Sequence, residues 1–242
     1  MKKIFFVLFF TLQIQGLFAQ TFIPEKNDSL IREENFAGYQ WIFKKINGIE
    51  VGVALEKRKF YGKHYRVLIS IINHNFSSIL FEPDSIRAEL RNKYGEKRDL
   101  ICYSEKEFTK KMKRRDNLNA ILLASLGGFN AGMSAHSTSY VSGYTSNGTY
   151  YHGTVQTYNP AVANYYQAQT MEQVANLQAE GQLNREDVKY RYAETSFIKP
   201  SGYYHGEINI KYHKGKTLQV TIPFLTADFV YTWDVEKIKT QK

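Results

Sequence analysis

The chain of 242 residues carries 32 Lys and Arg against 23 Asp and Glu, a formal net charge of +9, and it contains one cysteine. This length suits one large domain or one domain with an insertion. A single cysteine excludes an intramolecular disulfide, and the mild basic excess fits either an anionic partner surface or solubility alone.

The first twenty residues predict a secretory signal peptide over residues 1–19. Lys2 and Lys3 precede an apolar run, and Ala19 is a small residue at the expected cleavage point. The apolar run is too short to span a membrane. No cysteine lies near the cleavage point, so no lipid anchor is expected, and the mature chain is predicted to be exported to the periplasm or the cell surface.

The first firm element is a β-hairpin. It follows a polar, weakly patterned N-terminal extension over residues 20–38, which predicts at most one helical turn. The two strands of the hairpin, over 39–46 and 49–56, flank Asn47-Gly48, the pair that best tolerates the two positive φ angles of a type I′ turn.

Further strands are predicted at hairpin spacing. The run 64–74 is apolar on both faces, which is typical of a central strand, whereas 203–212 alternates and places Glu207 on a polar face. The remaining predicted strands cover 85–91, 98–103, 217–224 and 229–234.

The periodicity becomes helical after residue 103. Ser104 and Glu107 have the spacing of a capping box, which predicts a helix from about 105 to 126. Gly127-Gly128 then either ends this helix or lets a neighbour approach closely.

A second helix is predicted from Asn159, an N-cap, with Pro160 at its first position. We expect it to end near Glu180 with Gly181 as its C-terminal cap, and a shorter helix to follow over 184–193.

Small residues recur along one side of each predicted helix. Two such faces allow two helices to approach closely, which predicts an antiparallel helical hairpin. The small residues are Ala120, Ala124, Gly128 and Gly132 on the first helix, and Ala161, Ala168, Ala175 and Ala179 on the second.

These patterns predict a mainly β fold, an antiparallel immunoglobulin-like β-sandwich with an inserted α-helical hairpin. The first part of the sandwich covers 39–104 and the second part 195–236. The hairpin covers 105–194, and a tail covers 237–242.

Part of the chain resembles a known family. The run YRVLISIINHNFSSILFEPDSIRAEL is similar to the strand–Asn–turn–strand core of immunoglobulin-like sandwiches of the late-embryogenesis-abundant WHy type, with Asn73, Pro83 and Asp84 at the matching positions. The segment KPSGYYHGEINIKY and the following TLQVTIPF resemble uncharacterised secreted bacterial proteins of similar build. This resemblance implies a sandwich and supplies no catalytic residue.

The 55 residues from Asn117 to Met171 contain no Asp, Glu, Lys or Arg. Their middle, 127–158, is predicted to be a Gly/Ser/Tyr-rich loop. The loop is either a flexible linker or a contact surface for an envelope protein or a glycan. The candidate contact residues are Tyr140, Tyr144, Tyr150, Tyr151 and Tyr158.

Five basic residues directly precede the apolar end of the first predicted helix. A basic segment beside an apolar helix fits an anionic membrane surface, and it fits equally a solvated first half of a long helix. The residues are Lys110, Lys111, Lys113, Arg114 and Arg115. Nucleic acid is not an expected partner, because no binding motif is present.

The sequence contains no known catalytic or cofactor-binding motif, so we expect a non-catalytic protein without cofactor or metal. The enzymatic alternative would use Cys102 as a nucleophile, or His136 with His152 at a shared metal ion. We expect Cys102 to be a buried and inert thiol.

Overall fold

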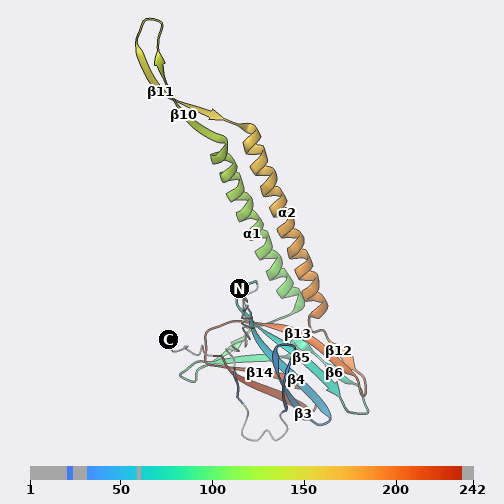
Figure 1. Cartoon of the computed structure of the whole chain (residues 1–242). Coiled ribbons are helices and arrows are strands. Elements are labelled where there is room, and N and C mark those ends of the chain that lie inside the picture. Colours follow the sequence, from blue (N-terminus) through green and yellow to red (C-terminus); the bar gives the residue numbers. More distant parts are fainter. Residues whose placement is uncertain (1–20, 24–31, 59–60, 236–242) are drawn as a thin grey trace, which may run out of the picture. The chain divides into compact units, whose positions relative to one another are not determined.

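The computed structural model describes residues 21–23, 32–58 and 61–235 (Figure 1). The predicted signal peptide and tail lie outside these residues. The chain divides into two compact units. The first, called the β unit here, comprises Met1–Arg58, Lys63–Cys102 and Glu194–Lys242, and the second, the hairpin unit, comprises Lys59–Gly62 and Tyr103–Ala193.

In the described part of the chain, antiparallel strands build a five-stranded and a six-stranded sheet. The first has the order β1 (Thr21–Phe22), β15 (Ala227–Asp234), β14 (Thr217–Phe224), β7 (Arg87–Arg91) and β8 (Lys97–Leu100). The second has the order β2 (Arg32–Phe36), β3 (Tyr39–Ile46), β4 (Ile49–Arg58), β5 (His64–Asn73), β13 (Tyr203–Lys211) and β9 (Cys102–Tyr103). A separate pair joins β12 (Ser196–Ile198) to β6 (Ile79–Phe81), and a short 3-10 helix, Pro83–Ser85, precedes β7.

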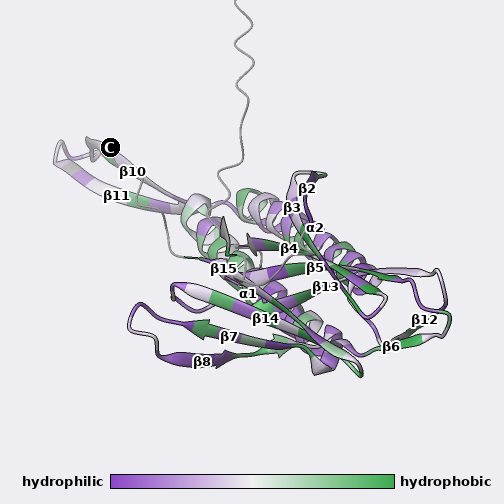
Figure 2. Cartoon of the chain, turned by 90° about the horizontal axis from the view of Figure 1, so that it is seen from below, coloured by the Kyte–Doolittle hydropathy of each residue, from purple (hydrophilic) through white to green (hydrophobic). Residues whose placement is uncertain are grey.

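The two large sheets share a buried core. Tyr231 of β15 donates its hydroxyl hydrogen to the carbonyl oxygen of Val51 in β4, at 2.6 Å. Hydrophobic and hydrophilic residues alternate along β14 and β7 (Figure 2), and Leu218, Val220 and Ile222 are fully buried. The mainly β, antiparallel character predicted from the sequence is therefore confirmed.

The predicted first hairpin is present with its predicted turn. Asn47 and Gly48 join β3 to β4 with φ angles of 49° and 74°, the two positive values that a type I′ turn requires. The central position predicted for β5 is also confirmed, because this strand lies between β4 and β13.

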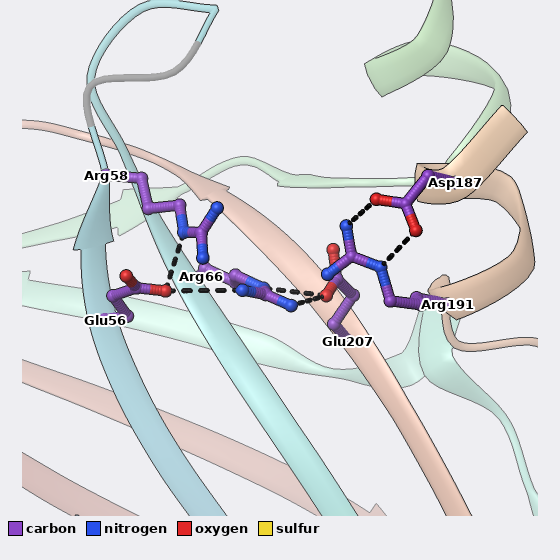
Figure 3. A network of polar contacts seen from close by, with 6 residues as sticks. All are labelled: Glu56, Arg58, Arg66, Asp187, Arg191 and Glu207. Carbon is purple, nitrogen blue, oxygen red and sulfur yellow. Dashed lines mark hydrogen bonds and ion pairs between the residues drawn. The ribbon is translucent and has the colours of Figure 1, made fainter. Parts of the chain in front are cut away.

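The prediction that Glu207 lies on a polar face was wrong. Glu207 is only 3% exposed, because β13 lies between two strands and is buried on both faces along this segment. The guanidinium of Arg66 in β5 pairs with the carboxylate of Glu207, with Arg66 Nε at 2.7 Å from Glu207 Oε2 (Figure 3). Glu56 accepts from Arg66 at 3.4 Å and from Arg58 at 2.6 Å, so the buried charges are neutralised within the sheet.

We had expected no strand in the N-terminal extension, but the structure places β1 and β2 there. Residues 32–36 form β2 at the edge of the six-stranded sheet, and Thr21 and Phe22 pair with the end of β15. All five residues of β2 are exposed, so no apolar alternation marks this strand in the sequence.

The hairpin unit contains two long helices, α1 (Glu105–Ala135) and α2 (Pro160–Arg191), which pack side by side (Figure 1). The predicted capping box begins α1, since the backbone N–H groups of Glu107 and Ser104 donate to each other's side chains. The predicted N-cap begins α2, where Asn159 Oδ1 accepts from Ala161 N at 3.0 Å. An ion pair between Asp187 and Arg191 lies in its last turns (Figure 3).

Both predicted helix ends were wrong. Gly181, expected as a C-terminal cap, lies inside α2, and of the two alternatives for Gly127-Gly128 the close approach of a neighbour is confirmed at Gly127. Helix α1 continues past Gly127, where a Cβ atom would lie 2.1 Å from Thr170 Oγ1 of α2. Helix α2 continues past Gly181, where a Cβ atom would lie 2.6 Å from Asp116 Oδ2 of α1. These two glycines are present for close helix packing.

The prediction of a loop over 127–158 was also wrong. Residues 127–135 extend α1, and β10 (His136–Tyr144) and β11 (Tyr150–Tyr158) pair along nine positions. The backbone N–H of Asn159 donates to the carbonyl oxygen of Ala135 at 2.8 Å. The end of α1 and the start of α2 are therefore already hydrogen-bonded where the two strands begin. Ser, Thr, Tyr and Val, which are strand formers or neutral in strands, dominate this segment.

Adjacent glycines of α1 provide a matched test of this packing. We expect Gly127→Ala to lower the free energy of unfolding by about 1–3 kcal/mol, because its methyl group overlaps Thr170. Gly128→Ala meets nothing within 4 Å and is expected to raise the stability by up to about 1 kcal/mol. Urea unfolding followed by helical circular dichroism measures both, and equal effects of the two substitutions would contradict the close packing.

Candidate functional site

The 55 residues without charge form the part of the hairpin unit that includes β10 and β11. They comprise the second half of α1, both strands β10 and β11, and the first third of α2. We call residues 117–171 the uncharged end. A typical soluble surface is about 25–35% charged, so this is an unusual surface for a protein to expose to water.

Helix α1 presents opposite faces to its neighbour and to solvent in the uncharged end. Ala120, Gly127, Ala131 and Ala135 are buried against the rest of the unit. Large apolar side chains between 60% and 65% exposed follow one another along the opposite face, and we call them the apolar ridge. They are Leu118, Ile121, Leu122, Leu126, Phe129 and Met133.

Burial of the apolar ridge against a partner would contribute substantial free energy to binding. Fully burying a side chain of this size stabilises by about 1.5–3 kcal/mol, and each of the six is more than half exposed. Covering the ridge would therefore contribute on the order of 1 kcal/mol per side chain. An exposed apolar face of this extent is typical of a contact surface.

A groove of about 630 Å³ runs between α1 and α2, mostly within the uncharged end, and extends along α2 to Gln178. Small residues form its α1 wall, and small or uncharged polar residues form its α2 wall. The α1 wall contains Ala124, Gly128, Ala131 and Gly132, and the α2 wall contains Ala163, Gln167, Thr170, Met171, Val174, Ala175 and Gln178. Tyr158 of β11 completes the lining.

The β10–β11 sheet gathers most of the predicted contact tyrosines on one face. Its register pairs Tyr144 with Tyr150, whose ring centroids lie 5.2 Å apart, and Tyr158 with His136, at 5.1 Å. Tyr140 lies on the same face by the alternation of the strand, and its side chain is 87% exposed. Tyr151 occupies the position opposite Gly143.

The predicted basic residues lie on α1 directly before the apolar ridge. Lys110, Lys113, Arg114 and Arg115 are exposed. Lys111 is half-buried and donates to the Tyr103 hydroxyl at 3.2 Å, so its ammonium group already has a partner within the hairpin unit. Positions 110, 114, 118, 122 and 126 are four residues apart, so one row on the helix surface passes from two basic to three leucine side chains.

The structure separates the two histidines of the enzymatic alternative. His136 pairs with Tyr158 and His152 with Ser142, so six positions, about 20 Å, separate them along the strands. They are too far apart to share one metal ion. Among the described residues, no group of three or more His, Cys, Asp or Glu side chains is placed to hold a metal ion.

The surroundings of Cys102 disfavour the thiolate form of its side chain. It is half-buried at the start of β9, and burial raises the pKa of its thiol to about 12. A nucleophilic cysteine needs a lowered pKa, because only the thiolate attacks.

We therefore expect slow chemical labelling of Cys102 in the folded protein. At pH 8 a raised pKa leaves far less thiolate than in the unfolded chain, so a thiol reagent is expected to react on the order of 1,000-fold more slowly. The same protein in guanidinium chloride is the control. A folded rate within tenfold of the unfolded rate would restore Cys102 as a candidate nucleophile.

The apolar ridge and the groove were not predicted from the sequence. Their signal is present as two rows on one helix, with leucines at 118, 122 and 126 and small residues at 120, 124, 128 and 132. The small residues were expected to face α2; in the structure Ala120 is buried, whereas Ala124, Gly128 and Gly132 are exposed and line the groove.

The fold and the site define an antiparallel β protein with an inserted helical hairpin unit whose far end is uncharged. No protein-family model, curated protein or solved structure matches the chain.

Proposed function

We propose that the chain is an exported, non-catalytic binding or assembly module of the bacterial cell envelope, in which an immunoglobulin-like β-sandwich carries the hairpin unit. The contact surface is the uncharged end. The observation that supports this function is the exposure of the apolar ridge and of the tyrosine face within 55 consecutive residues that contain no charge.

Both features suit association. A partner that covers the uncharged end desolvates no charged side chain, so apolar burial is not opposed by the cost of removing ions from water. Tyrosine beside Ser, Thr and Gly offers large contact area and adaptable hydrogen bonds, as in the binding loops of antibodies. The partner class predicted from the sequence, an envelope protein or a glycan, fits these side chains.

Replacing β10, β11 and their turn tests this function without breaking the helices. Residues 136–158 are exchanged for a short Gly/Ser connector, because Ala135 and Asn159 already lie within hydrogen-bonding distance. We expect the shortened protein to lose at least about 90% of the partner captured from envelope extract, which corresponds to about 1.4 kcal/mol. Helical circular dichroism confirms that α1 and α2 remain, and equal capture by both proteins would contradict the proposal.

A membrane surface is the second candidate partner, favoured by the row that passes from Lys110 and Arg114 into the leucines of the apolar ridge. Cations beside an apolar helix face attract anionic headgroups while the apolar side chains enter the interface. Among the described residues, α1 alone is long and apolar enough to span a membrane by length and composition, with a hydropathy of 1.2.

Vesicle flotation separates this candidate from the first. If α1 binds a membrane surface, the protein floats with vesicles that contain anionic lipid, and Lys110→Glu with Arg114→Glu reduces the bound fraction at least about tenfold. Raising the salt concentration is expected to release the wild-type protein as well. Lys214→Glu with Lys216→Glu, which changes the same charge in the β unit, is the control. Absence of binding to anionic vesicles at low salt would remove the membrane candidate.

A further inference from the structure

The geometry of the hairpin unit points to a specific partner, a second copy of this chain. We infer that the apolar ridge of one copy seats in the groove of the next copy. This inference rests on the proposed function, because it uses the uncharged end as the contact surface and names what covers it.

The ridge and the α2 wall of the groove have the same length. The ridge runs from Leu118 to Met133, and the α2 wall of the groove runs from Ala163 to Gln178. Each is fifteen helical steps, which is about 22 Å at 1.5 Å per residue. A ridge of long side chains also suits the α1 wall of the groove in shape, because its Ala and Gly residues leave room for side chains from another helix.

The ridge and the groove also lie at the same height along the hairpin unit. Gly127 lies against Thr170, and Asp116 lies against Gly181. In an antiparallel pair, each step forward on one helix is a step backward on the other. Ala163 therefore lies level with residue 134 of α1, and Gln178 with residue 119. The groove thus spans levels 119–134, and the ridge spans 118–133.

The two surfaces point in different directions on α1. Phe129 of the ridge follows Gly128 of the groove, and Met133 follows Gly132, so ridge and groove are about 100° apart around the helix. Contact between two copies is therefore head-to-tail, with each copy giving a ridge and receiving one. If neighbouring copies stand parallel, surfaces at one height relate them by rotation without translation, and the contact closes into a ring when that rotation divides a full turn.

The strands beyond the helices support the same arrangement. In the described part of the chain, β10 and β11 pair only with each other, and the outward-facing backbone groups at both edges of this two-stranded sheet lack strand partners. An isolated pair of strands is marginally stable, and a free edge pairs readily with another chain. Copies joined through ridge and groove would bring such edges next to one another.

The charge distribution permits contact between identical chains. Copies of a chain with a net charge of +9 repel each other wherever basic residues meet. The ridge, the groove and both strands contain no charged residue, so the surfaces that meet carry no like charges and desolvate none.

Sedimentation velocity of the exported chain, residues 20–242, tests this assembly. Wild-type protein is expected to form a species larger than a monomer, and Leu122→Glu and Leu126→Glu, each alone, are expected to weaken association at least about 100-fold, since each places an unpaired charge in the contact. Leu183→Glu is the matched control, because Leu183 is 67% exposed on α2 but lies outside ridge and groove. Circular dichroism verifies that every variant keeps its helices.

Mixed cross-linking tests the head-to-tail geometry. In a Cys102→Ala background, Leu122→Cys and Ala175→Cys are made on separately tagged chains, since residue 175 lies level with residue 122. A short thiol cross-linker is expected to join the two tags in the mixture and to join neither variant to itself. Leu183→Cys in place of Leu122→Cys is the control.

The outcomes distinguish this inference from the proposed function. A wild-type monomer at about 100 μM, or equal association of Leu122→Glu and Leu183→Glu, overturns self-assembly. Self-cross-linking of Leu122→Cys alone overturns the head-to-tail contact. A monomer that still captures an envelope partner through β10 and β11, or that binds only vesicles, overturns self-assembly and leaves a contact function for the uncharged end.

Discussion

The close approach of α1 and α2 is the constraint on which the hairpin unit depends. Gly127 admits the side chain of Thr170, and Gly181 admits the carboxylate of Asp116, which pairs with Arg185. This spacing uses the small residues of α1 for the contact and turns its leucines outward. It also sets Ala135 beside Asn159, so the strands that follow begin already paired. The exposed ridge, the groove and the paired strands are thus consequences of one packing arrangement.

Several buried polar side chains of the β unit have their partners within that unit. Arg66 and Glu207 pair within the six-stranded sheet, and the Asn73 side chain donates to the carbonyls of Ser77 and Ile198, at 2.8 Å and 2.9 Å. A buried charge or amide that already has partners costs little where it is and gains little from a ligand. This contrast is why the uncharged end, where large side chains lack neighbours, is the better candidate for a contact surface.

The sequence predicted those features of the fold that depend on residues close together in the chain. Asn47-Gly48 marks a turn, and Ser104 with Glu107 marks a helix start, because the groups that satisfy the backbone lie within a few residues. Gly181 was misread as a helix end because the residue that requires it, Asp116, lies on the other helix, and for Gly127 the sequence could not decide between a helix end and close packing. Strand β2 has no buried face, and β10 and β11 mix Tyr and Val with Ser, Thr and Gly without regular alternation, so none of the three shows a period-two contrast in hydropathy.

The α2 side of the uncharged end decides which partner the whole surface suits. It carries Asn164, Gln167 and Gln169 among its exposed residues, and an amide placed in hydrocarbon without a partner costs several kcal/mol, on the order of 4–8 in the least polar solvents. A bilayer can therefore cover the apolar ridge but not the groove beside it. Another protein surface can cover both, since it brings hydrogen-bonding groups with its apolar side chains. The apolar ridge of this same chain offers such a surface, since it matches the α2 wall of the groove in length and height.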